Sequence, residues 1–258
     1  PLTLRSVNGK KFTTVRRSSG SARNFNITTS AVVDGFTIAD GNTGGSGGGI
    51  YMSDGLVQNC TMTNNRASTG GGGVYMDGGL VRNCLILRNW AAGLGNDGCG
   101  GVQMFGNSKL RGCVITANEG VDRAGGVRIH SANCEVDNCT IVGNYGNYHH
   151  AGILATAPAT VRNLIVSYNL YAAATEESFN LQGGSTAIYS CGPDVPAGDG
   201  NFTNSPLFMA MGSGSPGLGF VPGDLTLQRS SPCVNAATNL YWMPGATDIE
   251  GRPRVANG

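Results

Sequence analysis

The sequence contains few charged residues. Only 13% of its 258 residues are Asp, Glu, Lys or Arg, the formal net charge is +1, and just 3 residues are Lys. A chain this close to neutral lacks the basic surface that nucleic-acid binding requires, so we expect no nucleic-acid partner. Its apolar runs stay well below the roughly 18 residues of a membrane-spanning helix, so we also expect no membrane-spanning segment.

Direct signs of cellular location are missing too. The chain opens at Pro1 without a basic stretch followed by an apolar one, so no secretory leader is visible. The 8 cysteines do not prove an oxidising compartment, because five of them occupy one position of a repeat where a small buried side chain explains them. An extracellular location has to be inferred from other features.

What the sequence does contain is repetition. The phrase Gly-Gly-Ile-Tyr-Met at 48–52 returns as Gly-Gly-Val-Tyr-Met at 72–76 and as Gly-Gly-Val-Gln-Met at 100–104. A cysteine slot recurs every 24 to 29 residues, at Phe36, Cys60, Cys84, Cys113, Cys139, Leu164 and Cys191. Two more rows keep the same register, namely Gly41, Asn65, Asn89, Asn118, Asn144 and Asn169, and Gly35, Asn59, Asn83, Gly112, Asn138 and Asn163. A repeat of this length predicts a solenoid.

Within each repeat the apolar residues alternate, as in Ile50 and Met52 or Cys60 and Met62, and a period of two indicates strands. We predict three short strands per repeat. They are separated by a glycine-rich corner, a small polar corner and an asparagine corner, where left-handed backbone geometry suits Gly or Asn. The fold class is therefore all-β, a single-stranded parallel β-helix. A leucine-rich repeat is disfavoured, because the glycine runs leave no stretch for its helix.

Stacked coils place equivalent residues on top of one another, about 4.8 Å apart. We therefore predict one inward stack formed by Ile50, Val74, Val102, Val127 and Ile153, and a second formed by Cys60, Cys84, Cys113 and Cys139. The asparagines are expected to hydrogen-bond to each other along the stack. Residues 1–191 form the coils, and residues 192–258, rich in Pro and Gly, form a loop-rich segment packed on the last coils.

Several phrases carry a family resemblance. They are Cys191-Gly192-Pro193, Gly200-Asn201-Phe202, Ser205-Pro206-Leu207-Phe208, Ser230-Ser231-Pro232-Cys233-Val234-Asn235 and Asp248-Ile249-Glu250-Gly251-Arg252-Pro253-Arg254. Together they resemble the C-terminal half of bacterial choice-of-anchor Q right-handed β-helix proteins, and the upstream repeats resemble those of polymorphic outer membrane proteins. The resemblance implies a right-handed β-helix in a secreted or cell-surface location.

The outward positions give little sign of catalysis. β-Helix lyases and hydrolases need several carboxylates beside Lys, Arg or His on one strand face. No predicted outward row holds two neighbouring acids, so we expect no enzyme, no metal site and no cofactor. Charged residues in corner loops are expected to be solvated pairs or corner features rather than a site; they are Asp97, Glu119, Asp122, Arg123 and the pair His149 and His150.

Two outward rows are candidate binding surfaces. Arg82, Arg111 and Arg162 follow one another on the second strand, interrupted by Asp137, and with stacked Tyr51 and Tyr75 they form a possible carbohydrate face. The alternative is a solvated, partly self-neutralised surface. The second row is apolar and consists of Leu85, Val114 and Ile165. Such a stripe is expected to be covered, either by the C-terminal segment or by a partner.

Cys191 and Cys233 are candidates for a disulfide. Cys191 ends the cysteine row and Cys233 follows the loop-rich stretch, so a bond would pin that stretch onto the final coil. The family resemblance supports the pairing, since both cysteines fall at recurrent positions of its C-terminal pattern. In the alternative, Cys191 is simply the last buried thiol of its row.

Two functions remain as hypotheses. The first is a secreted or cell-surface structural domain, adhesin-like or part of an extracellular fibre, that associates with itself through open ends or the apolar stripe. The second is a polysaccharide-binding module, or a polysaccharide lyase or glycoside hydrolase, that acts along the outer face of the β-helix. The expected partner is thus a second copy or a cell-surface polysaccharide.

Overall fold

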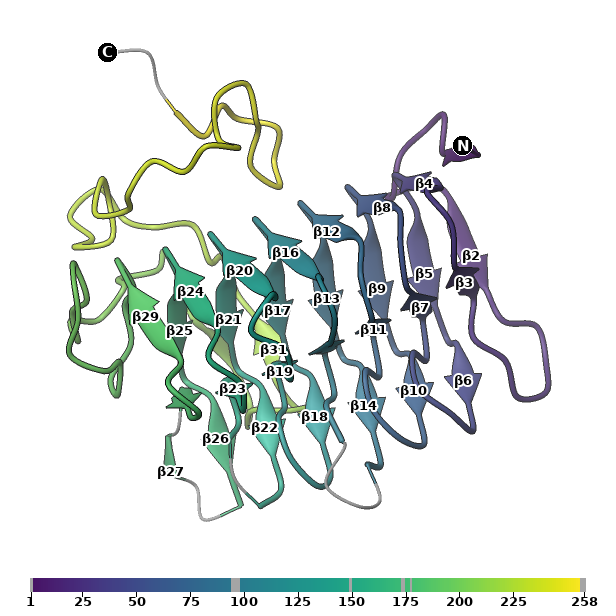
Figure 1. Cartoon of the computed structure of the whole chain (residues 1–258), viewed down its shortest axis with the longest axis horizontal. Helices are drawn as coiled ribbons and strands as arrows, with labels where there is room; N and C mark the ends of the chain where they lie inside the picture. Colours follow the sequence, from purple (N-terminus) through teal and green to yellow (C-terminus); the bar gives the residue numbers. More distant parts are fainter. Residues whose placement is uncertain (1, 94–97, 149, 173–174, 177, 256–258) are drawn as a thin grey trace.

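The protein is wound into a helix of short strands that stack side by side along one axis (Figure 1). This computed structural model describes residues 2–93, 98–148, 150–172, 175–176 and 178–255. Within these residues every regular element is a β-strand. None of them forms a helix long and apolar enough to cross a membrane. The predicted all-β parallel β-helix is confirmed, because successive coils pair through parallel strands.

Three sheets of three-residue strands form the sides of the helix. Sheet 1 consists of β3 (Phe25–Ile27), β7 (Ile50–Met52), β11 (Val74–Met76), β15 (Val102–Met104), β19 (Val127–Ile129), β23 (Ile153–Ala155) and β28 (Phe179–Leu181). Sheet 2 consists of β1 (Thr3–Arg5), β4 (Val32–Asp34), β8 (Leu56–Gln58), β12 (Leu80–Arg82), β16 (Lys109–Arg111), β20 (Glu135–Asp137), β24 (Thr160–Arg162) and β29 (Thr186–Ile188). Sheet 3 consists of β2 (Thr14–Arg16), β5 (Thr37–Ala39), β9 (Thr61–Thr63), β13 (Leu85–Leu87), β17 (Val114–Thr116), β21 (Thr140–Val142) and β25 (Ile165–Ser167).

A fourth sheet of two-residue strands directly follows the row of asparagines that begins at Asn65. Sheet 4 consists of β6 (Asn42–Thr43), β10 (Arg66–Ala67), β14 (Trp90–Ala91), β18 (Glu119–Gly120), β22 (Tyr145–Gly146), β26 (Leu170–Tyr171) and the antiparallel β27 (Thr175–Glu176). Two residues are too few to show alternation, so these strands come in addition to the three that the sequence predicts. A separate hairpin in the C-terminal segment consists of β30 (Gly212–Ser213) and β31 (Val221–Pro222).

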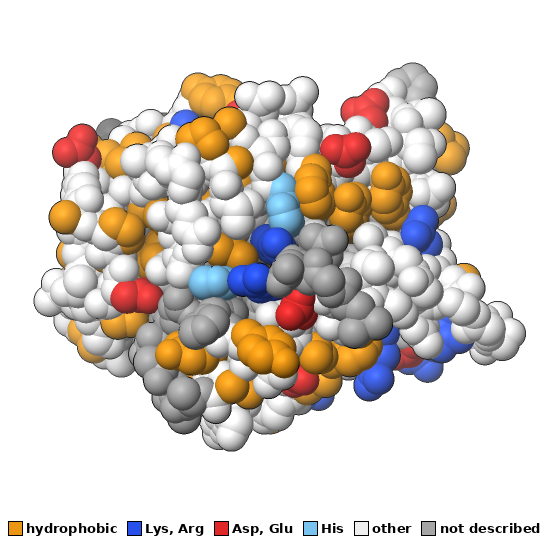
Figure 2. All heavy atoms as spheres, turned by 60° about the horizontal axis from the view of Figure 1, so that its bottom comes forward, with side chains coloured by type: hydrophobic (Ala, Val, Ile, Leu, Met, Phe, Trp, Pro, Cys, Tyr) orange, Lys and Arg blue, Asp and Glu red, His pale blue; other side chains and the backbone are white. Residues whose placement is uncertain are grey.

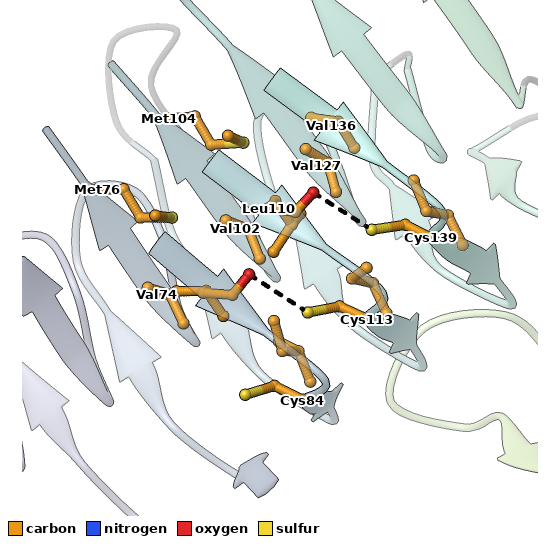
Figure 3. Packing of buried hydrophobic residues seen from close by; sticks show 14 of the residues in the cluster. Val74, Met76, Cys84, Val102, Met104, Leu110, Cys113, Val127, Val136 and Cys139 are labelled. Atoms are coloured by element: carbon orange, nitrogen blue, oxygen red, sulfur yellow. Dashed lines mark hydrogen bonds between the residues drawn. The ribbon is translucent and has the colours of Figure 1, made fainter. Parts of the chain in front are cut away.

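The predicted inward stacks are confirmed. Ile50, Val74 and Val102 pair in register across β7, β11 and β15, and all three side chains are fully buried. The cysteines line up in the same way (Figure 3). The Sγ of Cys139, for example, lies 3.7 Å from the backbone oxygen of Leu110 in the coil before it. The core is thus a column of like residues, one layer per coil.

The predicted left-handed corner is also present. Every member of the row before the cysteine slot has a positive φ, from 53° at Asn83 to 82° at Gly35. Each coil has a second left-handed residue, which comes directly before the buried asparagine of the ladder. That position holds residues as different as Asn64, Arg88 and Ala117, so residue type does not reveal it in the sequence.

The ladder asparagines have zero solvent exposure and satisfy each other. Nδ2 of Asn118 donates to Oδ1 of Asn144 and to the carbonyl of Ile86, each at 2.9 Å. Its Oδ1 accepts from Nδ2 and from the backbone N–H of Asn89, at 2.9 and 3.0 Å. Each amide therefore uses its neighbours in the adjacent coils, and every step of the ladder is fixed by the next.

The last coil is covered by residues 192–204. The carboxylate of Asp194 accepts from the backbone N–H of Ser178 at 2.8 Å, and Oδ1 of Asn201 accepts from the backbone N–H of Ser190 at 2.9 Å. These side chains take the place of a further coil. The C-terminal end of the core is closed by the chain itself.

The first coil has no comparable cover within the described residues. Leu4 is 43% exposed, and Val15 and Phe25 are half-buried on the outermost core layer. Each of β1, β2 and β3 pairs only with the coil that follows it. Among the described residues, nothing covers the N-terminal end of the core.

The C-terminal segment first crosses sheet 3. Phe208 and Phe220 form a buried cluster with Ala117 and Val142. Gly143 is required beneath it, because its φ is +70° and an added Cβ would lie 2.2 Å from the ring of Phe220. This contact fixes the segment to the outside of the coils.

The same segment then crosses the left-handed corner (Figure 1, yellow). The backbone of Thr238 donates to Oδ1 of Asn163 at 3.0 Å and accepts from its Nδ2 at 2.9 Å. Nη2 of Arg254 lies 3.4 Å from the carbonyl of Gly112. The corner side chains, which point out of the coil, thus hold the segment in place.

Replacing Asn118 by Ala should break the ladder and destabilise the protein. The change removes four hydrogen bonds and leaves buried polar groups unpaired, which we expect to cost about 3 kcal/mol. Thermal unfolding should show a midpoint lower by roughly 6 to 12 °C. Asn107→Ala, at an exposed position, is the matched control. Equal midpoints for the two variants would contradict the ladder's role.

Candidate functional site

The predicted arginine row does not form one open face. Arg111 is only 7% exposed, because the C-terminal segment places Tyr241 and Trp242 over it, each ring centroid 5.2 Å from its Cζ. Nε1 of Trp242 donates to Oδ2 of the buried Asp137 at 3.1 Å. Arg111 therefore cannot face a polysaccharide, which corrects the expectation for this residue.

Arg111 and Arg162 belong to an ion-pair network. Oε2 of Glu135 lies 2.7 Å from Nη2 of Arg111 and 3.3 Å from Nη2 of Arg162, while Oε1 lies 3.0 Å from Nζ of Lys109. Nε of Arg162 lies 2.7 Å from Oδ1 of Asp137. Arg162 is thus already paired with two carboxylates, and the surface is self-neutralised at these coils.

Glu135 and Asp137 form an acid pair that the sequence reading missed. They are two residues apart on β20 and so share its outward face, a signal visible in the sequence. Burial raises the pKa of Glu135, but hydrogen bonds from Arg111 and Lys109 outweigh it and lower the pKa. A general acid for glycoside hydrolysis needs the opposite shift. Glu135 is therefore suited to holding arginines rather than to donating a proton.

The predicted stacking of the two tyrosines is present, and both are half-buried at outward positions of sheet 1. The ring centroids of Tyr51 and Tyr75 are 5.1 Å apart with an interplanar angle of 8°, and Arg23 lies over Tyr51 at 5.1 Å. The column continues through Phe105 to His130, whose rings are 4.2 Å apart. Protein side chains thus lie against both tyrosine rings, and their contact with sugar rings remains a prediction.

Next to this column, sheet 1 carries buried polar residues. Gln103 and Arg128 are adjacent in register and are 1% and 7% exposed. On the face shown in Figure 2, histidine side chains lie beside Lys or Arg side chains. His150 is 8% exposed with a φ of 69°, which fits the predicted corner feature.

The remaining loop candidates do not assemble a recognisable site. Glu119 lies in β18, and Asp122 and Arg123 lie between β18 and β19. Asp97 and His149 lie outside the described residues. Among the described residues, no three His, Cys, Asp or Glu side chains gather in a way that could hold a metal ion.

The apolar stripe is partly covered by the chain itself. Ile165 packs against the cluster that contains Phe208 and Phe220 of the C-terminal segment. Val114 lines a pocket whose other wall includes Leu225. Leu85 pairs with Val114 one coil closer to the N-terminus and is half-buried. Of the two covers that the sequence left open, the C-terminal segment is thus the one that lies over Ile165.

Cys191 and Cys233 are neighbours with free thiols. A hydrogen bond between them raises the pKa of Cys191 and lowers the pKa of Cys233. Both line a cavity of about 240 Å³ between the last coils and the C-terminal segment. The two side chains are thus placed together, and the disulfide remains a prediction.

The open part of the arginine row lies in a groove beneath the C-terminal segment. A pocket of about 190 Å³ is lined by Arg82, Trp242 and several amide side chains. A cleft of about 530 Å³ adjoins it toward the N-terminus, and the two share Asn59 and Thr247. This groove is a polar site at Arg82, the arginine of the predicted row that the C-terminal segment leaves exposed.

These coils define the class of protein as a parallel β-helix. A family model described as a right-handed β-helix region matches residues 11–191, well over half of the chain. The chain belongs to this family, which agrees with the expected right-handed fold. No curated protein and no solved structure matches the chain.

Oxidation should join Cys191 to Cys233. Because the two thiols are neighbours in one cavity, the bond should pin the C-terminal segment onto the last coil. Peptide mapping without reductant, after secretion into an oxidising medium, should yield a linked Cys191–Cys233 peptide. Free alkylation of both residues after unfolding would contradict this; Cys84, buried in the core, serves as the thiol that should stay free.

Proposed function

We propose that the protein is a structural domain of an extracellular surface, a rigid β-helical rod that associates with a second copy through its N-terminal coil. The observation that carries the proposal is the difference between the two ends. Residues 192–204 close the last coil, whereas the first coil leaves Leu4 exposed and the outer edges of three strands unpaired within the described chain. Such edges are templates for pairing with another strand.

Within the described residues only the N-terminal end of the core is uncovered, which favours a closed pair over a fibre. Two copies that meet through the same surface bury it completely and leave nothing to extend, whereas a filament needs a second, different open surface. The closed C-terminal end does not offer one. The C-terminal resemblance to secreted and anchored bacterial β-helix proteins supports the extracellular location.

Charge makes this association depend on salt. Residues 1–46 contain six basic and two acidic side chains, while the rest of the chain contains eleven basic and fourteen acidic ones. Figure 2 shows basic side chains gathered at the right-hand end, which is the N-terminal end of the rod. Two such ends repel each other at low ionic strength, and added salt screens the repulsion.

Sedimentation velocity should therefore show monomers in about 0.01 M NaCl and dimers in about 1 M NaCl, where the Debye length falls from about 30 Å to about 3 Å. Leu4→Lys should abolish the dimer by placing a charge on the open edge. Met209→Lys, at an exposed apolar position of the C-terminal segment, is the matched control and should still form dimers. Monomers at both salt concentrations would refute association through this end.

We further propose that the rod is not an enzyme. The acid pair of Glu135 and Asp137 is bound by Arg111 and Arg162, and the Glu135 pKa is lowered rather than raised. Incubation with pectins, alginates and glycosaminoglycans in the presence of calcium should release no unsaturated or reducing ends. Turnover that disappears in Glu135→Gln would overturn this proposal.

A further inference from the structure

The first coil turns the left-handed corner differently from the coils after it. Between sheet 2 and sheet 3 the later coils use two residues, such as Asn59 and Cys60 between β8 and β9. The first coil uses eight, residues 6–13, which lie between β1 and β2. Figure 1 shows this stretch, the corner loop, rising from the N-terminal end of the stack. The corner loop is thus an insertion into an otherwise regular repeat.

Hydrogen bonds hold the backbone of the corner loop in one place. Oγ of Ser6 donates to Oγ1 of Thr13 at 2.6 Å and so joins the two ends of the loop. The carbonyl of Lys10 accepts from Oγ1 of Thr37, in the next coil, at 2.7 Å. The N–H of Phe12 donates to the carbonyl of Gly9 at 3.1 Å. The loop is therefore a preformed part of the rod.

This fixed loop presents two large apolar side chains to solvent. Val7 is 96% exposed and Phe12 is 80% exposed. A single exposed apolar side chain is common on protein surfaces and needs no explanation. Here, however, two of them belong to one inserted loop, and neither adds to the core. The insertion therefore enlarges the exposed apolar surface of this end.

The same loop carries two cations. Lys10 and Lys11 lie between Val7 and Phe12 in the chain, and Lys11 is exposed. Within the described residues neither lysine forms an ion pair, whereas three carboxylates of this end pair with arginines. These pairs are Asp34 with Arg5, Asp40 with Arg16 and Glu250 with Arg252, with N–O distances of 2.9, 2.8 and 2.5 Å.

The surroundings of the loop do not cancel its charge. Residues 7–10 share a cleft with residues 247–251 of the C-terminal segment. Residues 247–255 contain two acidic and two basic side chains, so this stretch adds no net charge. The six basic and two acidic side chains of residues 1–46 leave an excess of four positive charges at this end.

Exposed apolar side chains beside unpaired lysines are suited to the surface of an anionic bilayer. The apolar groups enter the boundary between headgroups and acyl chains, while each ammonium group stays with the lipid phosphates at the end of its flexible stem. A stable contact with another protein buries about 800 Å² on each partner, which two side chains cannot supply. A fluid bilayer needs no matching shape and accepts them as they are.

We propose that the corner loop docks the rod reversibly on an anionic lipid bilayer. Phe12 and Val7 insert at the headgroup boundary, and Lys10 and Lys11 lie against the lipid phosphates. The proposed dimer uses a different feature, the edge of the core at Leu4, and this docking does not depend on it. The two respond to salt in opposite ways, because added salt weakens the attraction between unlike charges and the repulsion between like charges.

Flotation of the full chain with lipid vesicles tests the role of charge. In about 0.01 M NaCl the protein should float with vesicles of phosphatidylcholine and phosphatidylglycerol but not with pure phosphatidylcholine, and about 1 M NaCl should release it. Lys10→Gln together with Lys11→Gln should weaken binding by about tenfold or more. Arg88→Gln together with Arg229→Gln removes the same charge at two exposed positions elsewhere and should bind nearly as the wild type does.

The apolar contribution is tested by replacing Phe12. Phe12→Ser should weaken vesicle binding by about fivefold or more, whereas Phe12→Trp should retain it, because Trp favours the membrane–water interface. Met209→Ser, at an exposed apolar position of the C-terminal segment, is the matched control. Leu4→Lys should bind vesicles at least as well as the wild type, so docking and dimer formation can fail independently.

Four results would overturn the proposal. They are equal binding to both kinds of vesicle, binding to neither, undiminished binding of the double lysine variant, and undiminished binding of Phe12→Ser. Loss of the dimer by Phe12→Ser in about 1 M NaCl would also overturn it, since the loop would then pack against a second copy. All variants should keep the wild-type thermal midpoint, because the replaced side chains lie outside the core.

Discussion

The structure depends on a hydrogen-bond rule that acts between coils. A buried asparagine at the inner corner can satisfy its amide only by passing hydrogen bonds to the residue at the same place in the next coil. An amide both donates and accepts, so it pairs best with another amide, and asparagine therefore recurs at this position from coil to coil. The backbone hydrogen bonds between parallel strands likewise tie each coil to the coils on either side of it.

This hydrogen-bond rule explains both the ordered core of the rod and the need to cover its two ends. Each layer is covered by the next, so the stack has to be terminated at both ends. At the C-terminal end, the side chains of Asp194 and Asn201 accept hydrogen bonds from backbone N–H groups of the last coil, as a further coil would. At the N-terminal end, the described residues offer no such imitation. The difference between the ends gives the rod a direction, and the proposed association uses it.

The outward-facing residues are not constrained in this way. The outward rows repeat only loosely, because solvent accepts many side chains. Their roles are set by the one part of the chain that does not repeat. The C-terminal segment buries Arg111 under Trp242, leaves Arg82 open a coil earlier, and covers Ile165 with aromatic side chains. Residues of the same outward row thereby acquire different environments in successive coils.

The sequence by itself determined the coil, the inward stacks, the left-handed corner and the contact partners of Cys60 or Asn118, since these follow from a repeat in which like must pair with like. It also placed Cys191 and Cys233 as candidates for one another. The sheet of two-residue strands stayed hidden because two residues show no period. The burial of Arg111 under Trp242, the hydrogen bond from Trp242 to Asp137 and the groove at Arg82 were decided only by the tertiary structure. They depend on contacts between residues as far apart as Asp137 and Trp242, which no periodic pattern connects.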